Sequence, residues 1–255
     1  MKITFLGTCA YDYSPRLEGD LRNKFDKDAR RSSAMLIDGT ILVDCGTHTV
    51  NSLDIAAVPY SQITDIIITH LHCDHFEPKS IQKIAENRHF PLRVWVREDA
   101  KCDLDGVEIR KMPLYTPCTL PCGARVTGMI ANHDDKAYPQ HLLIEKDEKR
   151  VFYGCDGAWL MNQTYYHLNN RKLDFAVLDC TMGDYEGDYR IGEHNSIGML
   201  RVMLPSLRTV NIIDGHTKVY FSHLAPSLHK SHTETEQIAK ELGASVAYDG
   251  LEVEI

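Results

Sequence analysis

The 255-residue sequence contains no run of about 18 apolar residues, the length that a membrane-spanning helix needs. Its first residues, MKITFLGTCAYDYSPR, turn polar too soon for a secretory signal. Both absences predict a cytoplasmic protein. The chain also lacks an excess of positive charge, since 28 Lys and Arg against 36 Asp and Glu give a formal net charge of −8. We therefore expect no broad electrostatic surface for nucleic acid, although bound metal cations would still attract a small anion.

Paired cysteines are scarce as well. The eight cysteines are scattered along the chain and form no disulfide framework. Cys118 and Cys122 in PCTLPC have a spacing that suits a soft metal, but no second pair of Cys or His accompanies them. An apolar content of 43% without an evident linker predicts one folded domain over residues 1–255.

Short strand-like segments dominate the sequence. The apolar run LDFAVLDC at 173–180 predicts a strand that is buried on both faces. Helical spacing occurs at 77–89, 195–204 and 233–243, and Thr233 is the expected N-cap of the third helix. This order predicts two sheets between helices, a four-layer αββα sandwich of the α/β (α+β) class. The other predicted strands are residues 2–6, 33–37, 40–46, 64–70, 92–96, 107–112, 125–130, 141–145, 150–154, 210–214, 218–223 and 245–250.

Two long segments, residues 12–33 and 183–194, have neither a strand nor a helix pattern. The first is rich in charges of both signs, and the second is rich in Gly, Asp and Tyr. Long loops in a compact domain are often functional, so both are candidates for such a role.

Three histidines and an aspartate occur together in the segment THLHCDH, directly after three isoleucines. In an extended chain His70, His72 and Asp74 point to one side, and His75 follows in a turn. His70 and His72 can therefore share one metal ion, while Asp74 and His75 share a second. Imidazole and carboxylate ligands suit zinc, manganese or iron. Three histidines in six positions are improbable by chance where histidine makes up 13 of 255 residues.

The remaining ligands must come from elsewhere in the chain, because four groups cannot complete two sites. His133, Asp156 and His223 each follow an apolar strand-like run, which is where loops that carry functional residues begin. One carboxylate can contact both ions, and Asp156 is the candidate for that bridge. We therefore predict these three residues as metal ligands together with those of the motif.

The motifs resemble those of the metallo-β-lactamase fold superfamily. ITFLGT, ILVDCG, THLHCDH, the Asn-His pair at 132–133, YGCDG and FSH occur in that superfamily's order, and the resemblance covers nearly the whole chain. A finer similarity to PhnP-type cyclic phosphodiesterases, and more distantly to ribonuclease Z, is carried by residues 177–200 and by the C-terminal YDGLEVEI. The resemblance implies the metallo-β-lactamase fold and two divalent metal ions per chain, manganese or zinc, with iron as a further candidate.

The resemblance also implies a division of roles among the site residues. Asp44 would lie behind the ligands and orient one of them. His194, which opens a predicted helix after a loop, would assist the leaving group, and Asp74 is assigned a catalytic role beside it. A water activated by the ions would attack phosphorus. One ion would be held by His70, His72, His133 and Asp156, and the other by Asp74, His75, Asp156 and His223.

The implied reaction is the hydrolysis of a small, anionic, cyclic phosphodiester. Arg31, Tyr185 and Tyr189 are candidates for substrate contacts, either with a phosphate or by stacking on a base. The alternative is a metal-dependent hydrolase of a carboxylic ester, thioester or lactone on the same fold. Stable binding of nucleic acid is not expected, since the chain is acidic and lacks the long tRNA-gripping insertion of ribonuclease Z. The sequence leaves a homodimer open.

Residues 12–33 depart from the PhnP-type pattern. Proteins of that type carry a cysteine-based structural zinc in the loop after the first strand, whereas residues 12–33 contain no cysteine. We therefore expect no zinc in this loop. Ion pairs are expected to order it instead, among Arg16, Arg22, Arg30, Arg31, Asp20, Asp26 and Asp28.

Overall fold

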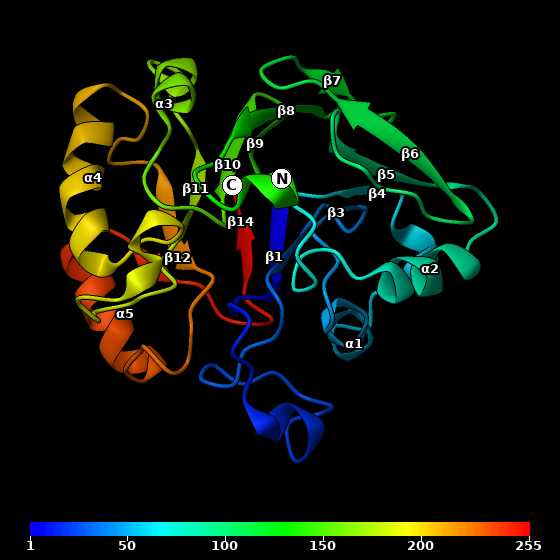
Figure 1. Cartoon of the computed structure of the whole chain (residues 1–255), viewed down its shortest axis with the longest axis horizontal. Coiled ribbons are helices and arrows are strands. Elements are labelled where there is room, and N and C mark those ends of the chain that lie inside the picture. Colours follow the sequence, from blue (N-terminus) through cyan, green and yellow to red (C-terminus); the bar gives the residue numbers. More distant parts are fainter.

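Two seven-stranded β-sheets lie face to face in the computed structural model, which describes all 255 residues (Figure 1). The strand orders are β14-β1-β2-β3-β4-β5-β6 and β13-β12-β11-β10-β9-β8-β7. The first sheet comprises β1 (Lys2–Gly7), β2 (Ala34–Ile37), β3 (Ile41–Val43), β4 (Asp65–Ile67), β5 (Leu92–Arg97), β6 (Val107–Met112) and β14 (Glu252–Glu254). The second comprises β7 (Cys118–Thr119), β8 (Arg125–Ile130), β9 (Gln140–Lys146), β10 (Lys149–Gly154), β11 (Phe175–Asp179), β12 (Lys218–Ser222) and β13 (Ser245–Val246).

Helices cover the outer side of each sheet, which confirms the predicted sandwich (Figure 1). The first sheet carries α1 (Thr49–Ile55) and α2 (Pro78–Glu86), and the second carries α3 (Asn162–Leu168), α4 (Ile197–Thr209) and α5 (His232–Glu241). Four short 3₁₀ helices are η1 (Pro15–Glu18), η2 (Tyr60–Gln62), η3 (Asp135–Ala137) and η4 (Tyr189–Gly192). None of the helices has the length and apolar character needed to cross a membrane.

Apolar side chains form three layers, one between the sheets and one beneath the helices on each side. The sequence of β11 is apolar almost throughout because its side chains enter two of these layers. Phe175 and Val177 enter the layer between the sheets, while Ala176 and Leu178 enter the layer beneath α4. All five of its residues are buried, as the sequence predicts.

The strand directions bring several loops to one edge of the sandwich. Strands β3 to β6 run parallel to one another, as do β10 to β13. Strand β8 has the same direction as β10, because both are antiparallel to β9. The carboxyl ends of parallel strands meet at one edge of a sheet, where ligands of such folds bind. The segments that follow β3, β4, β8, β10, β11 and β12 therefore emerge close together.

Some sequence predictions of local structure were wrong. Residues 210–214 form turns rather than a strand, because Ile212 N–H bonds back to Leu207 O and its side chain packs beneath α4. Helix α5 has Ser231 rather than Thr233 as its N-cap, since Ser231 and Glu234 form a capping box. The short helices α1 and α3 were not predicted.

Candidate metal centre

The seven predicted ligands meet at the edge where strands of both sheets end. Four follow β4, one follows β8, one follows β10 and one follows β12. Their ligand atoms form two groups, within each of which all atoms lie within 4.8 Å of one another. The groups are His70, His72 and His133, and Asp74, His75, Asp156 and His223.

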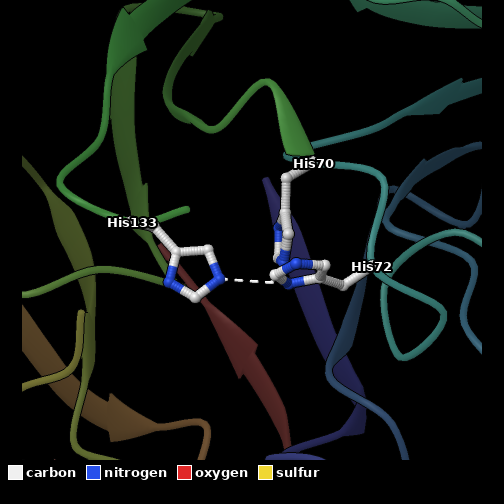
Figure 2. A group of neighbouring side chains, drawn as sticks. All are labelled: His70, His72 and His133. Carbon is white, nitrogen blue, oxygen red and sulfur yellow. Dashed lines mark hydrogen bonds between the residues drawn. The ribbon is translucent and has the colours of Figure 1, made fainter. Parts of the chain in front are cut away.

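The first group consists of three imidazoles that converge from two loops (Figure 2). Nδ1 of His72 and Nε2 of His133 are 3.1 Å apart. His70 is buried, and its Nε2 has no hydrogen-bond partner. Buried ring nitrogens are rarely left without a partner, and convergence of several on one point is typical of a metal site.

The second group adds two carboxylates to two imidazoles. The Nε2 atoms of His75 and His223 are 3.1 Å apart, and Oδ2 of Asp74 lies 3.4 Å and 3.5 Å from them. Oδ2 of Asp156 lies 3.3 Å from His223 and 3.6 Å from His133 of the first group. Asp156 therefore stands between the two groups.

The separations suit metal coordination. Ligand atoms at about 2.0–2.2 Å from a tetrahedral ion lie about 3.3–3.6 Å from one another. The distances between neighbouring ligand atoms here span 3.1–3.8 Å. Imidazole and carboxylate donors favour divalent ions such as zinc and manganese. The residues present therefore fit divalent metal ions.

Behind the ligands, Asp44 fixes two of the imidazoles. It follows β3, and its Oδ2 accepts the Nδ1–H of His75 at 2.8 Å. Its Oδ1 accepts the N–H and hydroxyl of Thr69 at 2.8 Å and 2.9 Å, and that hydroxyl oxygen is 3.0 Å from Nδ1 of His70. With Nδ1 protonated on both rings, the Nε2 lone pairs face the metal groups. A Cβ at Gly46 would lie only 1.8 Å from the carbonyl oxygen of Asp74, so glycine permits this close approach.

A second aspartate–threonine pair occupies the matching place in the other sheet. Asp179 ends β11, and its Oδ2 accepts the hydroxyl of Thr181 at 2.8 Å. The hydroxyl oxygen of Thr181 lies 2.7 Å from Nδ1 of His223. Neither residue was predicted from the sequence, although VLDCT carries a signal, an aspartate at the carboxyl end of a strand buried on both faces.

His194 lies among these groups and is buried. Its Nδ1 is 2.7 Å from Oδ1 of Asp156 and 3.2 Å from Oδ2 of Asp179. The local structure that places it is the start of α4, where the side chain of Ser196 accepts the N–H of Met199 and so caps the helix two residues after His194. With Nδ1 committed to the carboxylates, Nε2 is left for another partner.

The carboxylates control the protonation of the imidazoles. Burial lowers the pKa of His75, but Asp74 and Asp44 outweigh it and raise that pKa to about 10. Burial likewise opposes charge on His194, yet Asp156 and Asp179 raise its pKa to about 11. These electrostatics favour imidazolium at His194 near neutral pH.

A cavity of about 400 Å³ opens over the ligands. It contains five of the seven ligands together with His194, so the metal groups and the candidate acid share one space. Its walls include two residues that sequence analysis did not single out, Arg190 and Glu193. The full lining is Ala10, Tyr11, Asp12, His72, Cys73, Asp74, His133, Asp156, Thr181, Arg190, Glu193, His194, His223 and Ala225.

The structure does not bring Arg31, a predicted substrate contact, to the cavity. Its side chain is fully buried and lies outside the cavity. It donates to Leu21 O at 2.6 Å, to Lys24 O at 3.3 Å and to Oδ1 of Asn51 at 2.8 Å. Arg31 therefore orders the loop of residues 12–33 from inside, in the region where PhnP-type proteins use zinc. Its partners are mainly carbonyl groups rather than the carboxylates within the loop that the sequence suggested.

Tyr185 and Tyr189 lie on the second long loop, beside the residues that line the cavity. Tyr185 is 52% exposed and Tyr189 is 89% exposed, and neither lines the cavity. Stacking of either ring on a substrate stays a prediction. Among the aromatic side chains, Tyr11 lines the cavity and is 65% exposed, although no sequence motif indicated its place.

Solved structures that resemble the whole chain identify its fold. The metallo-beta-lactamase fold protein YhfI from Bacillus subtilis superposes with a TM-score of 0.75 over 100% of this chain and 99% of that one, at 15% identity. A diphosphatase from the PhnP family superposes with a TM-score of 0.76 over 100% and 96%, at 18% identity. The protein therefore has the metallo-β-lactamase fold, which confirms the fold that the motifs implied.

Sequence relatives cover smaller parts of the chain. A family model described as Anti-Pycsar protein Apyc1 matches residues 23–93, which include the THLHCDH motif. A ribonuclease Z from Methanococcus maripaludis is 37% identical over 99 residues, which are 37% of this chain and 29% of that protein. The match thus spans less than a third of the length of that relative.

Proposed function

We propose that this single-domain protein is a metal-dependent phosphodiesterase that hydrolyses a small, cyclic phosphodiester with two divalent ions. The observation that carries the proposal is the place of His194, whose Nδ1 is held by Asp156 and Asp179 beside the ligand groups. Its Nε2 is thereby free to serve a leaving oxygen. The ribonuclease Z and the PhnP-family diphosphatase to which the chain is similar add support for phosphoester chemistry.

The ligands divide into two sets in this proposal. Manganese or zinc suits the donors, and iron is accepted by the same chemistry. Bound ions would activate a water and neutralise charge on the phosphoryl oxygens. One ion would be held by His70, His72, His133 and Asp156, and the other by Asp74, His75, Asp156 and His223.

The chain's own residues supply the proton transfer. His194 as imidazolium donates from Nε2 to the departing alkoxide, a contribution that is typically about 10²–10⁴-fold. Asp179 and Thr181 hold its ring through Nδ1. Asp74 has the catalytic part assigned to it as a ligand beside His75 and His223, since its Oδ2 would help to hold an ion that activates the water.

The size of the cavity and the net charge of the chain indicate which substrate the protein accepts. A small anionic diester fits a cavity of about 400 Å³, and the net charge of −8 disfavours stable binding of nucleic acid. We place the protein in the cytoplasm on the strength of its sequence. The alternative is hydrolysis of a carboxylic ester, thioester or lactone. A thiolate leaving group is weakly basic, so hydrolysis of a thioester has less need of an imidazolium proton donor beside the ligands.

Substrate profiling tests the proposal. Purified protein loaded with manganese or zinc is assayed on bis(p-nitrophenyl) phosphate, 2′,3′-cyclic nucleotides, thioesters and lactones, and its ion content is measured by mass spectrometry. We expect two ions per chain and turnover of the phosphodiesters. Thioester or lactone turnover without phosphodiester turnover would establish the alternative instead.

A further inference from the structure

Arg190 is the single lysine or arginine that lines the cavity. It lies in η4, on the loop that leads to His194, and its side chain is 28% exposed. The other charged side chains of the lining are histidines and carboxylates. An arginine on the wall of such a cavity either forms only a surface ion pair or binds a negatively charged group of the substrate.

Asp188 holds the guanidinium in one orientation. Oδ1 of Asp188 accepts Nε–H at 2.8 Å, and Oδ2 accepts Nη2–H at 2.9 Å. Oδ1 also accepts the backbone N–H of Arg190 at 2.9 Å, so Asp188 is the N-cap of η4 as well. A carboxylate that binds both the main chain and the side chain of Arg190 favours this one orientation.

This pairing leaves one edge of the guanidinium free. Arginine has five N–H donors, one on Nε and two on each Nη. Asp188 takes the edge formed by Nε and Nη2. The edge formed by Nη1 and Nη2 retains two parallel donors, which is the arrangement that binds two oxygens of a phosphate.

The backbone couples Arg190 to His194. The carbonyl oxygen of Arg190 accepts the N–H of Glu193 at 2.8 Å and that of His194 at 2.9 Å. Arg190 and the proposed acid thus belong to one hydrogen-bonded turn on the cavity wall. A group held by Arg190 would therefore stand in a fixed relation to His194.

We propose that Arg190 binds phosphoryl oxygens of the substrate through its free Nη1–Nη2 edge, and that Asp188 is its positioning residue. This inference rests on the proposed phosphodiesterase function and names a side chain that serves it. The carboxylates of Asp12 and Glu193, which also line the cavity, repel anions. The positive charge of Arg190 offsets this repulsion and allows a phosphate to bind beside it.

Binding of inorganic phosphate tests the role without requiring turnover. Manganese-loaded wild type, Arg190→Gln and Arg190→Lys are titrated with phosphate in a calorimeter, and their ion content is measured in parallel. We expect Arg190→Gln to weaken phosphate binding about 10- to 100-fold at unchanged ion content. Arg190→Lys should restore part of the affinity, since it returns the charge without the fork. Arg201→Gln, which removes an exposed arginine of α4, is the matched control.

Titration with pyrophosphate under the same conditions shows which phosphate group of the substrate Arg190 binds. An equal loss for phosphate and pyrophosphate assigns Arg190 to the phosphoryl group under attack. A larger loss for pyrophosphate assigns it to a second phosphate of the substrate. A change of less than twofold for both ligands would overturn the proposal, even if the protein proves to be a phosphodiesterase. Absence of phosphodiester turnover in a wild type that still binds phosphate through Arg190 would instead overturn the proposed function alone.

A double-mutant cycle tests the positioning role of Asp188. Asp188→Asn removes the ion pair, and we expect it to weaken phosphate binding several-fold. The double variant Asp188→Asn/Arg190→Gln should bind no more weakly than Arg190→Gln, because Asp188 acts through Arg190. Additive losses would show that Asp188 has a structural role independent of Arg190. Glu186→Gln, an exposed carboxylate on the same loop, is the control for the loss of a negative charge.

Discussion

Asp44 and His75 form a fully buried pair, in which Oδ2 of Asp44 accepts the Nδ1–H of His75 at 2.8 Å and neither side chain is exposed to solvent. The carboxylate only accepts, so the ring proton must stay on Nδ1. Nε2 of His75 then faces His223 and Asp74. A residue that touches no substrate thus decides which nitrogen is offered to a metal ion.

Replacement of this carboxylate should weaken metal binding. In Asp44→Asn one of the two oxygens becomes an amide that donates, and it conflicts with the N–H of His75 or of Thr69. We expect the affinity for zinc to fall about 10- to 100-fold, as measured by competition with a chromogenic chelator. Asp103→Asn, at an exposed carboxylate, is the control and should bind zinc like the wild type. A loss of less than twofold in Asp44→Asn would contradict the orienting role.

His194 and His72 should respond differently to removal. His194→Ala is expected to retain its metal ions but to lose about 10²–10⁴-fold in kcat, because it loses the proton donor. His72→Ala should lose metal and activity together, since His72 belongs to the first ligand group. Ion content by mass spectrometry and initial rates on bis(p-nitrophenyl) phosphate distinguish the two. Full activity of His194→Ala, or full metal content of His72→Ala, would refute the corresponding assignment.

The pH dependence of turnover should reveal the partnership of His194 with Asp179. Burial opposes charge on His194, but Asp156 and Asp179 raise its pKa to about 11. An acid catalyst with a raised pKa keeps its proton at high pH, so the alkaline limb of kcat/KM should lie well above pH 7. In Asp179→Asn the pKa of His194 falls, and this limb should move to lower pH. An unmoved limb in a variant that keeps its ions would exclude Asp179 from this role.

The histidine motif could be predicted from sequence because its ligands lie within six positions of one another. Asp156 and His223 were also accessible, since each follows a strand-like run and such runs end at a common edge. Asp179 and Thr181 were not, because their function depends on a contact with His223 some forty residues away. The place of Arg31 was not predictable for a similar reason: a sequence does not show whether an arginine in a charged loop points inward to carbonyl groups or outward to a substrate.

Metal loading should depend on pH in a defined direction. Ligands bind metal ions only when deprotonated, so binding must displace protons from His75 and His223. Burial lowers the pKa of His223, but Asp156 and hydrogen bonds with Asp179 and Asp74 raise it to about 10, the value that also applies to His75. The affinity for zinc should therefore rise as the pH increases from 6 to 8, with proton release detectable as a buffer-dependent heat in calorimetry. An affinity that is constant over this range would contradict the raised pKa values.

Arg31 should matter to stability rather than to catalysis. Its guanidinium holds the carbonyl groups of Leu21 and Lys24 and lies 3.8 Å from the buried carboxylate of Asp249. Arg31→Met would leave these buried carbonyl acceptors without their donor, a change that costs about 1–3 kcal/mol, whereas Asp249 would keep the backbone N–H of residue 31 and the hydroxyl of Thr8. Urea unfolding should show this loss, and limited proteolysis should cut within residues 12–33. Arg22→Met, at an exposed arginine of the same loop, should leave both measurements unchanged. If Arg31→Met instead keeps its stability and raises KM for the phosphodiester, the residue would belong to the substrate after all.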